Sequence, residues 1–279
     1  MRQLAHHCTN VKLVDNRQFC QTKSGFILSK NERECCMSIE LTWLGHSTWW
    51  IKTGEYKILI DPFIGDNPAA NVPSTSLEPT HILVSHGHYD HIADAVEIAK
   101  RSKAVVITNY EIATWLETKH GVTNTVGMNL GGKTRMPFGT VQFTPAVHSS
   151  MLPDGSYGGA CGGFLLQLDH ISDASANSQK PYSLYYTGDT ALFTDLKFIA
   201  RHGVDCLIVP IGDLYTMGPE ESIEAIQMVR PKLVLPTHYN TWSPIAQNAS
   251  AWIESVHKST SAQAIAPEVN AVLVLEDHP

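Results

Sequence analysis

The chain has 279 residues, with 20 Lys and Arg against 27 Asp and Glu, and a formal charge of −7. Apolar residues make up 43% of it, which suits one large globular domain and is too much for a disordered chain. A general nucleic-acid binder needs a basic surface, and a membrane span needs about 20 apolar residues in a row. The sequence has neither feature, so we expect a small-molecule substrate, no nucleic-acid partner and no membrane partner.

Residues 1–36 differ from the rest of the chain. They carry six basic and three acidic residues, which leaves −10 on residues 37–279, and they hold four of the six cysteines. The segment has no sustained hydrophobic period, no Cys-x-x-Cys pair and no apolar signal-peptide core. We expect a disordered extension or a start codon assigned too far upstream, followed by one domain over 37–279 in a reducing, cytoplasmic location.

The first elements of that domain are strands. β-Branched and aromatic runs at 39–44, 48–53 and 56–60 are separated by glycines and predict an antiparallel meander. The adjacent residues Trp49 and Trp50 should point to opposite sides of the second strand, one into the core and one exposed. An exposed Trp is compatible with a homo-oligomer, which the sequence leaves open.

The following elements alternate. A loop at 61–79 leads to a predicted strand at 82–85. Helices are predicted at 92–101 and 111–119, and single strands at 104–108 and 140–145. Two paired strands, at 162–168 and 182–187, are joined by a polar tip at 169–181. Helices at 192–202, 219–229 and 244–258 then alternate with strands at 206–210 and 233–236, before a last strand at 272–275. Strands first and βα units later indicate an α/β (α+β) sandwich.

The central motif is His86-Gly87-His88-Tyr89-Asp90-His91, between a predicted strand and a predicted helix. In an extended segment, residues two apart point to the same side, so His86 and His88 can hold one metal. The turn into the helix then directs Asp90 and His91 toward a neighbouring position. Imidazole and carboxylate donors suit zinc, manganese or iron better than calcium or magnesium.

Further donors follow other buried strands. His148, Asp189 and His238 each come just after the predicted end of a strand, where α/β folds place functional groups. Each alone is equally well explained as a capping residue. Together with the central motif, they predict one metal centre.

At this point the chain resembles the metallo-β-lactamase superfamily. The motifs Trp43-Leu44-Gly45-His46-Ser47, Leu59-Ile60-Asp61-Pro62-Phe63 and Met217-Gly218-Pro219-Glu220-Glu221 are similar to those of an uncharacterised bacterial family of metal-dependent hydrolases, itself similar to the ascorbate-6-phosphate lactonases. The resemblance implies a four-layer αβ/βα sandwich with two divalent metal ions, zinc or manganese, with iron also acceptable. It assigns His86, His88 and His148 to the first metal, Asp90, His91 and His238 to the second, and Asp189 as the bridge.

Two metals sharing a water can generate hydroxide near neutral pH, so we expect a metal-dependent hydrolase of a small ester, lactone or phosphodiester. Asp90 and Asp189 would act at the reaction centre, with His46 as a substrate contact or proton donor. Asp61 is either an acceptor that orients a ligand histidine or a turn cap. The alternatives are an RNA-processing nuclease of the same superfamily and a non-catalytic metal-binding protein; the acidic domain disfavours the first, and the complete donor set disfavours the second.

Residues 127–134 match the Walker A phosphate-binding pattern letter for letter. A phosphate cradle requires a helix directly after the loop. Pro137 and Gly139 lead instead into a predicted strand, so we expect a tight turn and no nucleotide site.

Overall fold

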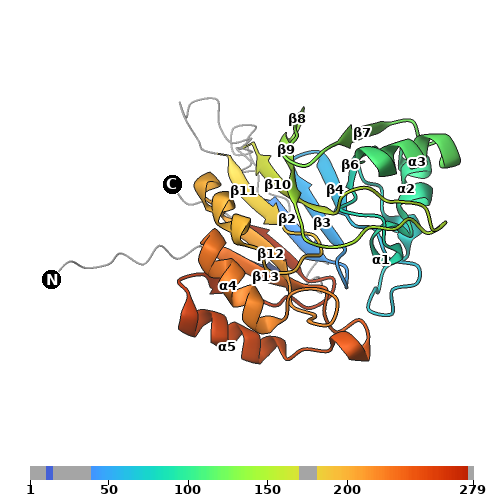
Figure 1. The fold of residues 1–279 in the computed structure, drawn as a ribbon. Coiled ribbons are helices and arrows are strands. Elements are labelled where there is room, and N and C mark those ends of the chain that lie inside the picture. The colour runs from blue at the N-terminus through green and yellow to red at the C-terminus, as the bar shows by residue number, and fades with distance from the viewer. Residues whose placement is uncertain (1–10, 15–38, 170–180, 276–279) are drawn as a thin grey trace, which may run out of the picture.

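The computed structural model describes residues 11–14, 39–169 and 181–275, and every statement below refers to these. Two β-sheets pack face to face, and helices cover their outer faces (Figure 1). This is the four-layer sandwich that the sequence predicted.

The first sheet has eight strands in the order β1-β15-β2-β3-β4-β5-β6-β7. The strands β2, β3 and β4 form the predicted antiparallel meander, and β4 to β7 run parallel. Their bounds are β1 Val11–Val14, β15 Val272–Leu275, β2 Ile39–Trp43, β3 Trp49–Thr53, β4 Tyr56–Ile60, β5 His81–Leu83, β6 Val105–Asn109 and β7 Thr125–Met128.

The second sheet has seven strands in the order β14-β13-β12-β11-β10-β9-β8. From β8 to β11 each strand is antiparallel to its neighbour, and from β11 to β14 the neighbouring strands are parallel. Their bounds are β14 Gln263–Ala264, β13 Leu233–Thr237, β12 Cys206–Pro210, β11 Tyr182–Tyr186, β10 Gly162–Leu168, β9 Gly139–Pro145 and β8 Lys133–Met136.

Helices form the two outer layers. The helices α1 (Tyr89–Ile92), α2 (Ala95–Ser102) and α3 (Tyr110–His120) lie on the first sheet, while α4 (Pro219–Val229) and α5 (Ala249–Ser259) lie on the second (Figure 1). Three 3₁₀ segments complete the secondary structure: Ser74–Ser76, Thr194–His202 and Ser243–Ile245.

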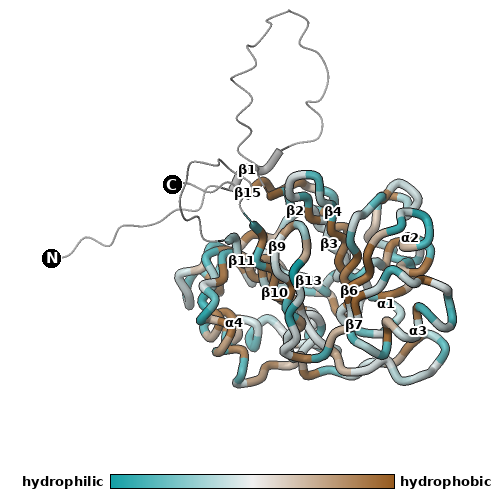
Figure 2. The backbone as a smooth tube through the Cα atoms, turned by 90° about the horizontal axis from the view of Figure 1, so that it is seen from above, coloured by the Kyte–Doolittle hydropathy of each residue, from teal (hydrophilic) through white to brown (hydrophobic). Residues whose placement is uncertain are grey.

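The alternation of strand residues builds two cores. In β4, Ile58 and Ile60 face the second sheet, whereas Leu59 faces the helices on the outer side. All three are fully buried, and burial of such a side chain stabilises the fold by about 1.5–3 kcal/mol. Figure 2 shows the resulting concentration of hydrophobic residues along the strands.

Several local predictions were wrong. The predicted helix at 244–258 is divided into the 3₁₀ segment Ser243–Ile245 and α5, which begins only at Ala249 after the N-cap Asn248. The predicted helix at 92–101 is interrupted between α1 and α2, because Asp94 accepts hydrogen bonds from the backbone N–H groups of Ile64 and Gly65 at 2.6 and 3.0 Å. Trp50 is not exposed: helices cover the outer face of β3, so Trp49 and Trp50 are both buried, in different cores. The short strands β7 and β8 were not predicted, and Thr194–His202 is a 3₁₀ helix rather than an α-helix.

Parts of two predicted segments lie outside the described residues. Within 1–36 only Val11–Val14 are described, as a strand paired with β15, and the polar tip lacks 170–180. The predicted extension and the predicted domain boundary therefore stay predictions. In the described ranges, none of the helices has the length and apolar character needed to cross a membrane.

Six strands deliver functional residues to one edge of the sandwich. The strands β2, β4 and β5 end in the same direction, and so do β9, β11 and β13. The two sheets meet at that edge, where the backbone N–H of His238 donates to the carbonyl of His46 at 3.1 Å. Residues that follow these strands are thus brought together from distant parts of the chain.

Candidate metal centre

One cluster of donors contains only histidines. His86 Nε2 lies 3.0 Å from His88 Nδ1, and His148 Nε2 lies 3.3 Å from the same His88 atom. His86 is fully buried, while His88 and His148 are partly exposed. We call these residues the three-histidine group. They are the residues predicted for the first metal, and all three have one ring nitrogen within 4.8 Å of the others.

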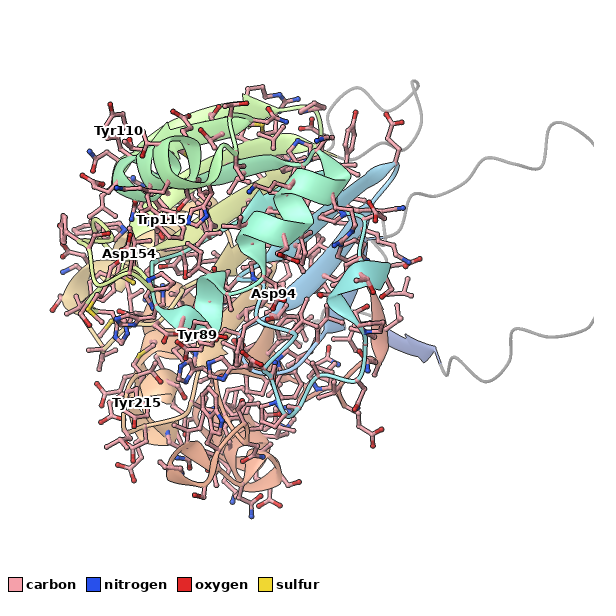
Figure 3. All side chains as sticks on the ribbon, turned by 90° about the vertical axis from the view of Figure 1, so that its right-hand side faces the viewer. Tyr89, Asp94, Tyr110, Trp115, Asp154 and Tyr215 are labelled. Atoms are coloured by element: carbon pink, nitrogen blue, oxygen red, sulfur yellow. The ribbon has the colours of Figure 1, made fainter. Side chains whose placement is uncertain are left out.

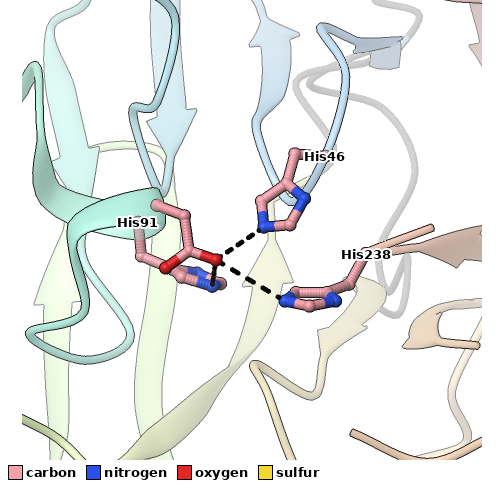
Figure 4. Close-up of side chains that lie close together, drawn as sticks. His46, His91 and His238 are labelled. Atoms are coloured by element: carbon pink, nitrogen blue, oxygen red, sulfur yellow. Dashed lines mark hydrogen bonds and ion pairs between the residues drawn. The ribbon is translucent and has the colours of Figure 1, made fainter. Parts of the chain in front are cut away.

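A second cluster surrounds the carboxylate of Asp90 (Figure 4). Asp90 Oδ2 lies 2.9 Å from His46 Nε2, 3.7 Å from His238 Nε2 and 3.8 Å from His91 Nε2. We call these four residues the carboxylate group. It contains the three residues predicted for the second metal and adds His46, which the sequence had not grouped with the ligands.

Asp189 lies between the two groups. Its Oδ2 is 3.0 Å from His238 Nε2, 3.2 Å from His91 Nε2 and 3.8 Å from His148 Nε2. The preceding Gly188 has a φ of +65°, and a Cβ there would lie 2.4 Å from the carbonyl oxygen of Gly162. Only glycine permits this turn, which delivers the carboxylate to the position expected of a bridge.

Asp61 orients one histidine of each group through the ring nitrogen Nδ1, directly in one case and through Ser85 in the other. Its Oδ2 accepts a hydrogen bond from His91 Nδ1 at 2.7 Å and from Ser85 Oγ at 2.6 Å, and Ser85 Oγ lies 2.9 Å from His86 Nδ1. The hydroxyl of Tyr186 donates to the same carboxylate oxygen at 2.6 Å. Asp61 therefore orients His91 directly and His86 through Ser85, as the orienting alternative predicted.

His46 is fixed through both its ring and its backbone. Thr241 Oγ1 lies 2.8 Å from Nδ1, and the His46 carbonyl accepts hydrogen bonds from Trp43 Nε1 and Thr237 Oγ1, both at 2.8 Å. The side chain is fully buried. His46 therefore fastens the first sheet to the second at the metal centre.

Backbone strain is concentrated at this edge. Of the eight non-glycine residues with positive φ in the described ranges, three are His46, Asp61 and His238, at 51°, 43° and 54°. Such conformations are unfavourable for residues with a side chain and persist where surrounding contacts impose them. The strained turns aim these three side chains across the site instead of along their strands.

The carboxylates and imidazoles shift one another's pKa values strongly. Burial opposes charging of Asp189, but His238 and His91 hold its pKa well below the ordinary range. Burial likewise lowers the pKa of His238, yet Asp189 outweighs it and raises that pKa to about 9. Burial and the nearby His238 lower the pKa of His46 to about 4, so His46 is a neutral imidazole. Without metal, the anionic carboxylate of Asp189 is thus balanced by the protonated imidazoles beside it.

The donor set fits divalent metal ions. His91 Nε2 and Asp189 Oδ1 are buried and have no hydrogen-bond partner, which is costly unless a ligand satisfies them. Mixed imidazole and carboxylate donors are those of zinc, manganese and iron sites, whereas calcium and magnesium prefer oxygen alone. Metal binding would also replace the protons that these groups otherwise share.

The structure brings together all seven predicted ligands and His46, and it also reveals residues that the sequence did not indicate. Tyr186 and Thr241 act through long-range contacts, and no local pattern marks either of them. The Walker-like segment covers the end of β7, a turn and the start of β8; the turn was predicted, and the two strands were not. The described residues therefore contain no phosphate cradle at that position.

Comparisons with known proteins agree with this geometry. The model of the beta-lactamase superfamily domain matches residues 56–239. A UPF0173 metal-dependent hydrolase from Thermus thermophilus is 40% identical over 230 residues, covering 82% of this chain and 96% of the relative. One from Enterococcus faecalis is 42% identical over 223 residues, covering 78% and 94%.

Solved structures show the same fold. Igni18, a metallo hydrolase from Ignicoccus hospitalis, superposes with a TM-score of 0.74 at 28% identity and covers 86% of this chain and all of its own. An isothiocyanate hydrolase from Delia radicum gut bacteria reaches 0.65 at 18% identity, covering 85% and 100%, which supports the fold alone. Fold, sequence and donor set thus agree, and the chain belongs to the UPF0173 family of metal-dependent hydrolases within the beta-lactamase superfamily.

Proposed function

We propose that the protein is a dinuclear hydrolase of a small ester, lactone or phosphodiester. Asp189 carries the proposal, because its carboxylate reaches His148 of the three-histidine group as well as His91 and His238 of the carboxylate group. A bridging carboxylate is the simplest explanation of one side chain that faces two separate donor clusters. Zinc and manganese suit the donors best, and iron is also acceptable.

The ligand roles follow from this arrangement. His86, His88 and His148 would hold the first ion; Asp90, His91 and His238 would hold the second; and Asp189 would join them. When bound, two divalent ions lower the pKa of a shared water toward 7 and stabilise charge on the reacting carbonyl or phosphoryl group. The chain supplies the fixed positions of the donors, so no side-chain nucleophile is needed.

His46 is better explained as a positioning residue than as a substrate contact. Its pKa of about 4 leaves one ring proton at neutral pH. With that proton on Nε2, His46 donates to Asp90 Oδ2, and Nδ1 accepts from Thr241 Oγ1. Both nitrogens are then engaged and the ring is buried, which supports a role in holding the Asp90 carboxylate toward the second ion.

The remaining proposals concern partners and location. We propose a small-molecule substrate with no nucleic-acid partner, and a reducing, cytoplasmic environment. Cys161 and Cys206 are buried as free thiols, which is compatible with such an environment. A homo-oligomer remains compatible with the sequence.

The test is Asp189→Ala. Metal content of the purified wild-type protein is measured by elemental analysis, and zinc- and manganese-reconstituted samples are assayed with esters, lactones, thioesters and phosphodiesters. We expect two ions per chain in the wild type, at most one in the variant, and more than a 1000-fold loss of hydrolysis. Exposed Asp195→Ala, six residues along the chain, is the matched control and should retain both ions. Unchanged metal content and activity in Asp189→Ala would rule out the dinuclear proposal.

A further inference from the structure

The segments that form or border the metal centre contain no Lys or Arg. They follow β2, β4, β5, β9, β11, β12 and β13 and comprise residues 44–48, 61–80, 84–94, 146–161, 187–193, 211–218 and 238–248; we call them the site segments. Although the chain has 20 Lys and Arg, the site segments include none, and they carry eight Asp and Glu.

The same segments hold most of the exposed large apolar side chains. The described residues include ten such side chains, and only Tyr110, Leu130 and Phe198 lie elsewhere. The other seven, which we call the apolar rim, are Tyr89, Val147, Met151, Tyr157, Leu214, Tyr215 and Trp242. Exposed apolar groups gathered in one region usually mark a binding surface.

Contacts connect the rim to the donors. The ring of Trp242 lies 5.0 Å from that of His46 and 5.9 Å from that of Phe63, and Phe63 lies 6.0 Å from Tyr89. Tyr89 follows His88 directly in the sequence, and Val147 precedes His148. Figure 3 labels Tyr89 on α1 and Tyr215 on the loop after β12.

Backbone hydrogen bonds join the remaining loops of the rim. Ala191 N donates to the Val147 carbonyl at 3.0 Å, and Met217 N donates to the Thr190 carbonyl at 2.9 Å. The turn that carries Leu214 and Tyr215 is therefore tied to the segment that follows Asp189. The hairpin closed by the Met151–Tyr157 bridge lies against Gly87, between two ligand histidines.

We infer that the substrate is an uncharged ester or lactone whose non-reacting part is apolar or aromatic and packs on this rim beside Trp242. The inference rests on the proposed function and narrows it. A substrate with a remote phosphate or carboxylate would meet no Lys or Arg of the site segments, and the Arg101 that contacts one of them is already paired with Glu78, so burial of that charge is unfavourable. A phosphodiester would depend on the metal ions alone, without an Arg or Lys of the site segments beside them. Apolar groups, by contrast, lose their contact with water on the rim.

The experiment uses two matched substrates, the p-nitrophenyl esters of hexanoic and adipic acid, which differ in a terminal methyl or carboxylate. We expect the metal-loaded wild type to prefer hexanoate by at least about tenfold in kcat/KM. Trp242→Ala should raise KM for hexanoate about tenfold with metal content unchanged, whereas Phe198→Ala, exposed and outside the site segments, should have no effect. Leu214→Arg should improve adipate relative to hexanoate.

A binding measurement separates this inference from the proposed function. Saturation-transfer NMR with hexanamide should show contact with the wild type and with Phe198→Ala, and a reduced signal with Trp242→Ala. Binding of the amide without hydrolysis of any ester would contradict the proposed function and leave the rim assignment standing. Hydrolysis with a preference for adipate, or no effect of Trp242→Ala on either readout, would overturn the inference. A change of oligomeric state in Trp242→Ala, seen by light scattering, would also overturn it in favour of an interface between copies.

Discussion

The two donor groups of the metal centre differ in how firmly they are held. In the carboxylate group, His91 is braced by Asp61, and His46 is fixed by Thr241 and by its own carbonyl. In the three-histidine group, His86 is oriented through Ser85, but His88 and His148 are partly exposed and contact other donors and Ser149 Oγ, which lies 3.4 Å from His88 Nε2. One group is built into the junction of the two sheets, and the other is completed by a loop. For the proposed dinuclear centre, we therefore expect one rigid ion position beside one that is more easily exchanged.

Removing a ligand from the braced group should have the largest effect. His91→Ala removes one imidazole partner from each of two buried carboxylates, those of Asp61 and Asp189. We expect loss of the second ion and a fall in kcat that exceeds the ~100-fold cost of losing an outer-shell partner. Elemental analysis and ester hydrolysis measure both effects. His202→Ala, a partly exposed histidine outside the site segments, is the control; equal losses in both variants would mean that the effect is not specific to the centre.

Asp61→Asn should weaken both positions together. An amide has a single acceptor oxygen, so it cannot serve both the donors at Oδ2, such as His91, and the backbone N–H of Ser85 at Oδ1. We expect a 10–100-fold loss of metal affinity, since loss of an outer-shell partner typically has this effect. Competition with a fluorescent chelator measures it, and thermal unfolding shows whether the fold survives. A folded variant with wild-type affinity would show that the contact does not orient the ligands.

The sequence predicted which donors come together, because strand ends and histidine spacing are local features. Residues such as His148 and His238 follow buried strands, and parallel strands bring their ends to one edge. The hydrogen bond between His46 and Asp90 could not be predicted from the sequence, because it depends on how two loops 44 residues apart approach each other. The same holds for Trp50, whose burial depends on helices that pack on the outer face of its strand. Local periodicity predicts which face a residue takes, but not what covers that face.

The difference between the groups should also appear when metal is withdrawn. Increasing chelator is expected to release the ion of the three-histidine group first, because two of its three donors, His88 and His148, are partly exposed and are not braced by Asp61 as His91 is. We expect two release steps whose chelator midpoints differ by at least about tenfold. His148→Ala should abolish the first step and leave the second, as measured by metal content after dialysis. A single step for both ions in the wild type would contradict the comparison.

Tyr186→Phe tests the outermost layer of support with the smallest change. The substitution removes only the hydroxyl that donates to Asp61, and the aromatic ring keeps its buried packing. One hydrogen bond contributes about 0.5–1.5 kcal/mol net, so metal affinity should fall about 2–10-fold. Tyr185→Phe, the neighbouring buried tyrosine in the same strand, controls for packing and should leave affinity unchanged. Because Asp61 retains Ser85 and His91 as donors, a loss as large as that of Asp61→Asn would mean that Tyr186 supports the centre by a route other than this carboxylate.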